Sequence, residues 1–325
     1  MTFPRLTLGT FPTPLHPLKR LSNRLGLDVW VKRDDLTGFA MGGNKVREAE
    51  FILADAIHQG ADVVLTAGTS QSNHARVIAT AARQLGIECH LFVSGQTLEQ
   101  PTGNLLLDYL AEAKVHFVSS LSERRPTMLA FAERLRNEGH EPYVVPIGGA
   151  DAIGAHGYVT GFEELHEQVR LLSSKPTCLL FASSSGATYA GMLVGKSRTS
   201  SEIKLLGIRT DLDPNSEVLI CSIANALAER LGMTRRFQPK EVELNSDYAG
   251  EGFPMPTENG VQALRQLWQL EGILLEPVYT AKAMAGLIDL AGKGLWRDER
   301  VIFLHTGGAP TVFSFAQLLS DSEKS

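Results

Sequence analysis

The chain has 325 residues, 43% of them hydrophobic, so it can bury a large core and is too long for one small domain. Its net charge of −5 argues against a nucleic-acid partner and against an anionic membrane surface. No apolar run approaches the roughly 18 residues of a membrane span, and the first residues lack the apolar stretch of a signal peptide.

The chain has three cysteines, far apart and without a CxxC pair, which argues against a disulfide framework and fits a reducing compartment. Its nine histidines show no HExxH motif or paired ligand spacing, so we expect no metal site. A cytoplasmic protein is the expectation.

Short β-rich runs alternate with helical patterns along the chain. Apolar residues recur at steps of three and four within 46–57 and 77–85, which predicts helices there. Strands alternating with helices predict βαβ units, hence an α/β fold of mainly parallel sheets flanked by helices. The predicted strands are 28–32, 61–66, 88–93, 115–118, 177–182, 204–209 and 300–305.

The stretch 42–48, Gly-Gly-Asn-Lys-Val-Arg-Glu, places Lys45 between a glycine pair and an amphipathic run. A lysine held against a buried carbonyl can lose its proton and form a Schiff base. Taken alone, the pattern fits an ordinary loop-to-helix junction better, with Asn44 as the helix cap. The interpretation of Lys45 therefore depends on the other segments.

A second segment, 66–76, follows a predicted strand and opens a helix with the run Gln-Ser-Asn-His. Ligands bind at the carboxyl ends of strands in open α/β sheets. Free N–H groups at a helix start favour an anion, here a substrate carboxylate. An equally good alternative is that Ser70 or Ser72 only caps the helix and binds no ligand. The closing glycine of a nucleophile elbow is missing.

A third segment, 182–191, again leads from a strand through small residues, Ser-Ser-Ser-Gly-Ala-Thr, into a helix. Hydroxyls and close backbone approach at a helix start can hold a phosphate. The spacing is neither GxGxxG nor a Walker motif, and a plain serine-capped loop is an equal alternative.

Two further segments lie near the C-terminus, 277–282 and 303–310. By themselves, Tyr279 is best explained as a packing aromatic and Thr306 as a turn residue at a strand end. A possible Schiff-base lysine, a phosphate loop and a carboxylate loop, all at strand ends, are together what a pyridoxal-phosphate enzyme acting on an amino acid requires.

At this point the chain resembles a known family. It is similar to the fold-type II (tryptophan-synthase β-like) pyridoxal-phosphate enzymes, and within them to the D-cysteine desulfhydrase / 1-aminocyclopropane-1-carboxylate deaminase group. The resemblance extends from Pro12 to Gly308, and its most specific stretches are 32–45, 71–74, 151–158 and 276–280.

The resemblance implies roles for the matching residues. Lys45 would form the Schiff base with pyridoxal 5'-phosphate and then move the substrate proton, and Tyr279 would act as acid/base or gate. Ser72 would be both a catalytic residue and part of the site that binds the substrate carboxylate. The other implied contacts are Asn44, Ser185, Gly186, Ala187 and Thr188 to the cofactor, Asn73 to its 3-hydroxyl, Thr280 or Thr306 to its ring nitrogen, and Asn73, His74, Gly157 and Phe253 to the substrate.

The resemblance also implies an organisation into two domains. Residues 1–48 plus 158–325 would form a large cofactor-binding domain and 49–157 a small domain, with the active site in the cleft between them. It further implies a homodimer acting on a small amino-acid substrate.

The implied activity is α,β-elimination from D-cysteine or a related β-substituted amino acid, giving pyruvate, ammonia and sulfide. Thr280 stands where ring-opening members carry glutamate, and Phe253 where a tyrosine is usual. Alternatives are 1-aminocyclopropane-1-carboxylate deamination, a cysteate sulfo-lyase reaction, or a non-catalytic cofactor-binding protein. A dinucleotide-dependent oxidoreductase is opposed by the missing GxGxxG.

Overall fold

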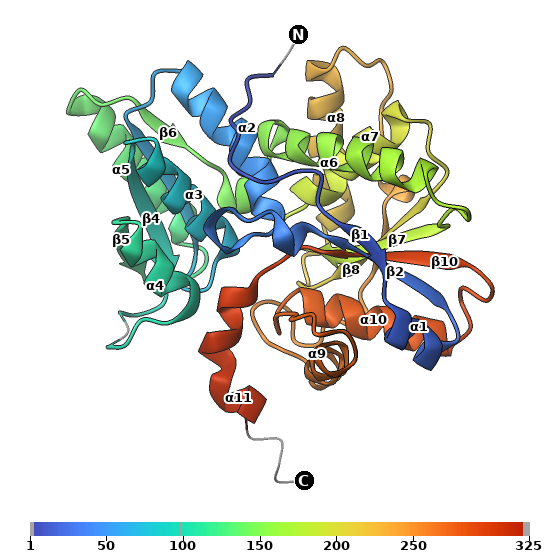
Figure 1. Cartoon of the computed structure of the whole chain (residues 1–325). Coiled ribbons are helices and arrows are strands. Elements are labelled where there is room, and N and C mark those ends of the chain that lie inside the picture. The colour runs from blue at the N-terminus through green and yellow to red at the C-terminus, as the bar shows by residue number, and fades with distance from the viewer. Residues whose placement is uncertain (1–2, 98, 321–325) are drawn as a thin grey trace.

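The computed structural model describes residues 3–97 and 99–320 and contains two sheets flanked by helices, as predicted (Figure 1). The strands are β1 Leu15–Pro17, β2 Asp28–Arg33, β3 Val63–Thr69, β4 Glu88–Ser94, β5 Lys114–Val118, β6 Pro142–Val144, β7 Cys178–Ser183, β8 Lys204–Arg209, β9 Glu243–Asn245 and β10 Arg300–His305. The helices are α1 Lys19–Leu25, α2 Asn44–His58, α3 Asn73–Gln84, α4 Gly103–Leu110, α5 Arg124–Asn137, α6 Ala152–Arg170, α7 Ala187–Arg198, α8 Ser216–Arg230, α9 Glu258–Glu271, α10 Thr280–Gly292 and α11 Ala316–Ser320.

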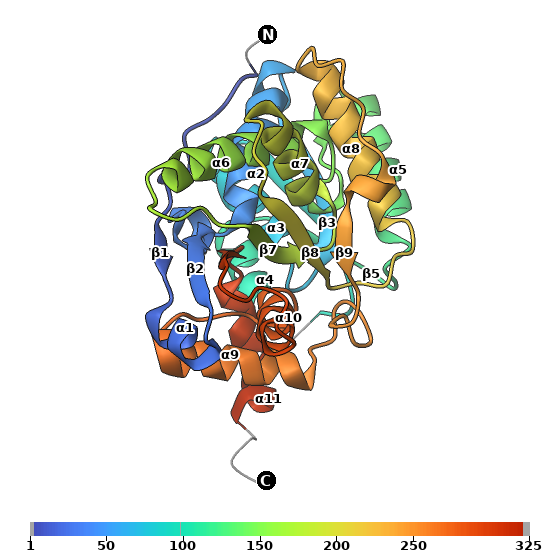
Figure 2. The same ribbon diagram turned by 90° about the vertical axis from the view of Figure 1, so that its right-hand side faces the viewer.

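The larger sheet has six strands in the order β1-β2-β10-β7-β8-β9. Every neighbouring pair is parallel except β1 and β2, which are antiparallel. Helices α6, α7 and α8 cover one face of this sheet, and α1, α9 and α10 cover the other (Figure 2). Both faces are therefore buried, which explains why its central strands read as continuous apolar runs.

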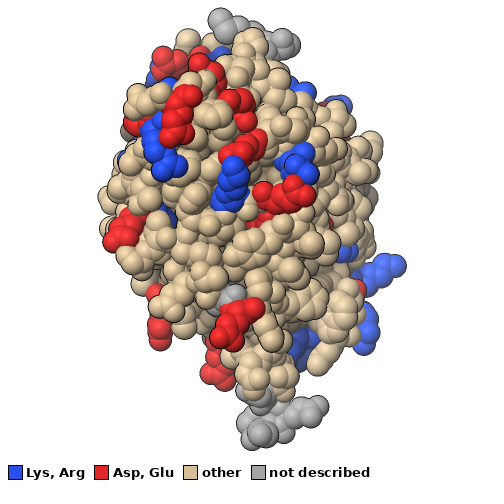
Figure 3. All heavy atoms as spheres, turned by 90° about the vertical axis from the view of Figure 1, so that its left-hand side faces the viewer, with Lys and Arg blue, Asp and Glu red and all other residues tan. Residues whose placement is uncertain are grey.

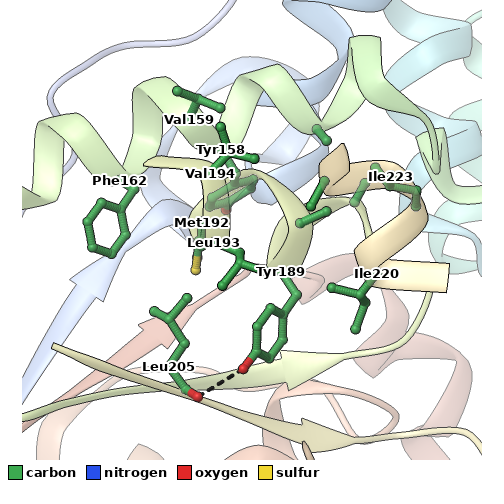
Figure 4. Close-up of a cluster of buried hydrophobic side chains, with 14 of the residues drawn as sticks. Tyr158, Val159, Phe162, Tyr189, Met192, Leu193, Val194, Leu205, Ile220 and Ile223 are labelled. Atoms are coloured by element: carbon green, nitrogen blue, oxygen red, sulfur yellow. Dashed lines mark hydrogen bonds between the residues drawn. The ribbon is translucent and has the colours of Figure 1, made fainter. Parts of the chain in front are cut away.

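Successive residues of one strand pack into the hydrophobic cores on opposite faces of the larger sheet. In β7, Leu179 and Phe181 pack toward α6–α8, whereas Cys178 and Leu180 pack toward α9 and α10. Figure 4 shows the first of these cores, where the Tyr189 hydroxyl of α7 donates a hydrogen bond to the backbone oxygen of Leu205 in β8, 3.0 Å away. This bond satisfies the polar end of a buried aromatic side chain.

The smaller sheet has four parallel strands in the order β5-β4-β3-β6. Helix α5 covers one face, and α2 and α3 cover the other.

On the side of the molecule drawn in Figure 3, acidic and basic side chains are interspersed toward the top, and the lower part is mostly uncharged.

The predicted strands are all present, with ends shifted by at most three residues. Three short strands were not predicted: β1, β6 and β9, each three residues long. The four strands of the smaller sheet span 63–144, inside the range 49–157 assigned to the small domain. The domain boundaries themselves stay a prediction.

Candidate active site

A cavity of about 420 Å3 lies where β3, β7, β8 and β10 end and where α2, α3 and α7 begin. It therefore brings together segments separated by more than 200 residues of chain, at the sheet edge where ligands bind in parallel α/β folds. Eleven of the predicted site residues line it: Asn44, Lys45, Ser72, Asn73, His74, Ser185, Gly186, Thr188, Phe253, Tyr279 and Thr306.

Three predicted site residues lie outside the cavity lining. Gly157 sits in α6 against α2, where an added Cβ would come 2.3 Å from the backbone oxygen of Arg47. Ala187 is buried in the first turn of α7. Thr280 is buried, and its hydroxyl accepts from the backbone N–H of Glu276 at 2.9 Å and donates to Glu276 Oε1 at 3.2 Å. These three residues therefore pack behind the cavity lining and support the residues that form it.

The glycine pair before Lys45 is required by local geometry. Gly42 and Gly43 have φ values of 73° and 110°, which residues with a side chain rarely adopt. A Cβ on Gly42 would lie 2.0 Å from the backbone oxygen of Asp35, and one on Gly43 would lie 3.0 Å from that of Thr306. The pair lets α2 start directly against the end of β10 and so directs Lys45 into the cavity.

Lys45 is held at two points. Its Nζ donates to Oε2 of Glu48, one helical turn on, and to the backbone oxygen of Gly148, both at 2.8 Å. The Glu48 side chain is fully buried, whereas that of Lys45 is 12% exposed. The amine is therefore placed at the cavity wall with a defined hydrogen-bond partner on its protein side.

The start of α7 forms a cradle for an anion. Its first turn leaves backbone N–H groups without helical acceptors, and Gly186 before it has a φ of 93°. The Thr188 hydroxyl accepts from the Asn44 amide at 3.0 Å and donates to Glu48 Oε1 at 3.0 Å. Ser185 also lines the cavity beside this turn. The free backbone N–H groups of this turn suit a phosphate group.

The start of α3 forms the opposite wall. Ser72 caps this helix, because its hydroxyl accepts from the backbone N–H of Ala75 at 3.1 Å, and it lines the cavity as well. Asn73 is fixed by Arg76 and Asn104, both of which donate to its Oδ1 at 2.9 Å. The two interpretations of this segment, cap and binding site, are therefore compatible.

His74 is buried within α3, and its Nε2 lies 2.9 Å from the Thr66 hydroxyl. Burial, with a smaller contribution from the positive charge of Lys45, holds its pKa well below the ordinary value. A neutral ring at this position adds no positive charge to the site.

Tyr279 stands at the start of α10, and its ring stacks on that of Phe253 with centroids 5.8 Å apart. Burial raises its pKa, as do the charges of Glu276 and Asp211, so the phenol is protonated at neutral pH. The Glu276 carboxylate accepts from the backbone N–H groups of Val278, Tyr279 and Thr280 at 2.6–2.8 Å and so fixes the turn that leads into α10.

Sequence reasoning missed five charged groups at the site. Arg124, Asp211, Asp213 and Glu276 line the cavity, and Glu48 lies directly behind Lys45. Glu276 could have been found, since it lies in the stretch 276–280 that carries the family resemblance. Arg124 could not have been found, because no local sequence pattern marks it. It reaches the cavity from the start of α5, the helix that covers one face of the smaller sheet.

The residues present fit pyridoxal phosphate. A lysine amine at the wall, a helix start with hydroxyls for a phosphate, and a second helix start for a carboxylate converge on one cavity of parallel α/β sheets. Fold and site together define the class of enzymes that bind this cofactor through a lysine.

Comparison with known proteins gives the family. The chain belongs to the family described as pyridoxal-phosphate dependent enzyme, whose model matches residues 6–307. It is 39% identical over 320 residues, 96% of both chains, to D-cysteine desulfhydrase of Salmonella choleraesuis (strain SC-B67), and 38% identical, with the same coverage, to that of Salmonella typhi.

Solved structures agree with this assignment. A crystal structure of an ACC deaminase homologue superposes with a TM-score of 0.90 and 38% identity, covering 98% of this chain and 95% of the other. Threonine deaminase isoform 2 from Solanum lycopersicum gives 0.68 at 18% identity over 96% and 83%, which shows a shared fold alone. In the part of the chain that the structure describes, no helix has the length and apolarity needed to cross a membrane.

Proposed function

We propose that the protein is a lyase that carries out α,β-elimination on D-cysteine or a related β-substituted amino acid, giving pyruvate, ammonia and sulfide. The observation that carries the proposal is the placement of Lys45 in one cavity with the α7 cradle and the α3 start. Identity of 39% over 96% of the chain to a D-cysteine desulfhydrase supports the choice of substrate.

In this proposal each side of the cavity has its own task. Ser185, Gly186 and Thr188 hold the cofactor phosphate, with Ala187 supplying a backbone N–H, and Asn44 orients the Thr188 hydroxyl. Asn73 faces the cofactor ring from the α3 side, and Thr306 from the end of β10. The bound cofactor supplies an electron-withdrawing system that acidifies the substrate Cα.

The protein's own groups bind the substrate and move protons. Ser72 and its neighbouring N–H groups at the α3 start bind the substrate carboxylate. Lys45 Nζ takes the proton from Cα as a general base. Tyr279, protonated and placed by Phe253, donates a proton to the departing group or closes the site over it.

Two alternative substrates have support of their own. Arg124 lines the cavity near Tyr279, and a guanidinium there suits an anionic side chain such as the sulfonate of cysteate. The structural likeness to an ACC deaminase homologue favours 1-aminocyclopropane-1-carboxylate. Against ring opening, Thr280 lies outside the cavity lining and its hydroxyl is engaged by Glu276.

The first test combines a spectrum with a product assay. Wild type, Lys45→Ala and the control Lys293→Ala, an exposed surface lysine, are scanned for the visible band of lysine-bound cofactor and then given D-cysteine. We expect band, sulfide and pyruvate in wild type and in the control, and none of them in Lys45→Ala. A band without D-cysteine turnover rejects this substrate, and cysteate (sulfite) and the cyclopropane acid (2-oxobutyrate) are tested next. Cofactor binding without turnover of any of them supports a non-catalytic binding protein.

We further propose a cytoplasmic homodimer with a small domain of residues 49–157. The three cysteines are free and buried, as in a reducing compartment. Leu110 of α4 is 71% exposed and Met41 57%, and both line a second, apolar cavity between α3 and α4. Sedimentation of wild type and Leu110→Glu tests this surface: a dimer that dissociates in the variant supports it, and a wild-type monomer rejects it.

A further inference from the structure

Glu48 connects the two parts of the site that meet the cofactor. Its Oε2 accepts from Lys45 Nζ at 2.8 Å, and its Oε1 accepts from the Thr188 hydroxyl at 3.0 Å. The side chain has no exposed surface. One buried carboxylate therefore lies behind both the reacting amine and the anion cradle.

Cofactor binding makes two demands at this point. The Lys45 amine must be neutral to act as a nucleophile, so it must lose the proton of its ammonium form. A phosphate monoester also brings a charge of about −1.5 to −2 into the cradle beside Glu48. A second negative charge in a buried site is strongly disfavoured. The ion pair of Lys45 and Glu48 satisfies neither demand as it stands.

The surroundings of Glu48 favour a neutral carboxyl. Burial raises its pKa most strongly, while the Lys45 charge and the Thr188 hydroxyl lower it. Asp151, at the start of α6, raises it further. His74 of α3, whose ring is neutral, flanks Gly149 as Glu48 does: a Cβ on Gly149 would lie 2.9 Å from Glu48 Oε2 and 3.4 Å from His74 Cε1. Lys45 is thus the cation in contact with the carboxylate, and its loss of charge would leave Glu48 unbalanced.

The same geometry shows where the proton can go. We propose that Glu48 accepts the proton that Lys45 gives up, and that it stands as a neutral carboxyl behind the anion cradle when the cofactor is bound. One N–H bond of the ammonium breaks and one O–H bond forms on Oε2, so an ammonium–carboxylate pair becomes an amine and a carboxylic acid, with no net change in charge. The proton stays inside the protein.

This inference rests on the proposed function, because Lys45 must be the residue that bonds the cofactor. It makes a quantitative prediction about protons. Wild type retains the Lys45 proton on Glu48, whereas Glu48→Gln must release it to solvent. At pH 7 the variant should release about one more proton per bound cofactor than wild type.

Calorimetry measures this difference directly. Full-length protein freed of cofactor is titrated with pyridoxal phosphate in buffers of different ionisation enthalpy, and the buffer dependence of the heat gives the protons exchanged. Glu50→Gln is the matched control, since Glu50 is also buried on α2 but binds Arg5 and the backbone of Leu8 and Gly9. It should keep the wild-type proton count. Equal release by wild type and Glu48→Gln overturns the inference.

A second measurement does not depend on the variant folding. The infrared difference spectrum of wild type with and without cofactor should gain the C=O band of a protonated carboxyl group, and no such gain overturns the inference. Failure of the proposed function has a different signature: wild type would show either no visible band of lysine-bound cofactor or the band without turnover of any candidate substrate, and neither result depends on the proton count.

Discussion

Phe253 stacks on Tyr279, with ring centroids 5.8 Å apart and an angle of 29° between the planes. The two residues come from different segments, a loop before α9 and the start of α10, and both line the cavity. Phe253 has no hydroxyl, so it contributes shape and orientation to this wall and no proton. In the proposed mechanism, proton transfer is therefore assigned to Tyr279 alone, and Phe253 holds the Tyr279 ring in position.

Phe253→Leu should lower kcat/KM by about twofold to tenfold, because an aromatic pair contributes about 0.5–1.5 kcal/mol beyond its buried area. Initial rates of sulfide release measure the effect. Phe313→Leu, at a side chain 63% exposed, serves as the control and should match wild type. An unchanged rate in Phe253→Leu would show that the stacking does not position Tyr279.

Tyr279→Phe keeps the stacked ring and removes only the hydroxyl. If the phenol transfers a proton in the reaction, kcat should fall by about 10²–10⁴-fold. The visible band of the bound cofactor should be unchanged, since Lys45 is intact. A loss of less than threefold would instead assign Tyr279 to closing the site.

The sequence patterns predicted the parts of this fold that depend on local chemistry. The seven longer strands carry β-rich runs, and those in the middle of the sheets, such as β3, β7 and β10, are largely apolar because both sheet faces are covered, which is a strong signal. β1, β6 and β9 were missed because three residues carry too little periodicity, and two of them, β1 and β6, contain proline. What makes them strands is the partner beside them.

The site was predictable where a segment carries its own geometric demand. The pair Gly42 and Gly43 and the polar helix starts are local signals. Arg124 and Glu48 had no such signal. Arg124 reaches the cavity from α5, which packs on the smaller sheet, and Glu48 looks in the sequence like an ordinary residue on a helix face. Thr280 is a different case: the family resemblance implied a contact with the cofactor ring nitrogen, and this contact stays a prediction, because in the structure the Thr280 hydroxyl bonds to Glu276 and lies outside the cavity lining.

Gly43→Ala tests the turn that aims Lys45. The residue has a φ of 110°, and the new Cβ would meet the backbone oxygen of Thr306. We expect a loss of about 1–2 kcal/mol in the free energy of unfolding from the strained backbone and at least tenfold weaker cofactor binding from displacement of Lys45. Gly60→Ala is the matched control, with a φ of 76° and nothing within 4 Å of its Cβ. It should lose stability but retain the affinity for cofactor.

Asp34→Asn tests the buried ion pair that fixes α2 to the body. Asp34 accepts from Arg47 at 2.8 and 2.9 Å, and both side chains are almost fully buried. Removing one partner leaves a buried charge poorly compensated, so we expect the free energy of unfolding to fall by about 3–5 kcal/mol at pH 7. Denaturant unfolding measures the loss. Glu167→Gln, in an exposed pair with Arg170, should cost less than about 0.5 kcal/mol.

The stability that Asp34 provides should depend on pH in a defined direction. Burial alone would raise its pKa, but the Arg47 guanidinium outweighs burial and lowers the pKa to about 2. The group is therefore more acidic in the folded state than in the unfolded chain, where its pKa is about 3.9. Its contribution is fully present above pH 3.9 and is lost as the pH falls through about 2. The difference in unfolding free energy between wild type and Asp34→Asn should consequently be constant from pH 7 to pH 5 and shrink below pH 4, by about 2–3 kcal/mol at pH 2. A difference that stayed constant down to pH 2 would show that the variant loses stability through packing and not through the charge of Asp34.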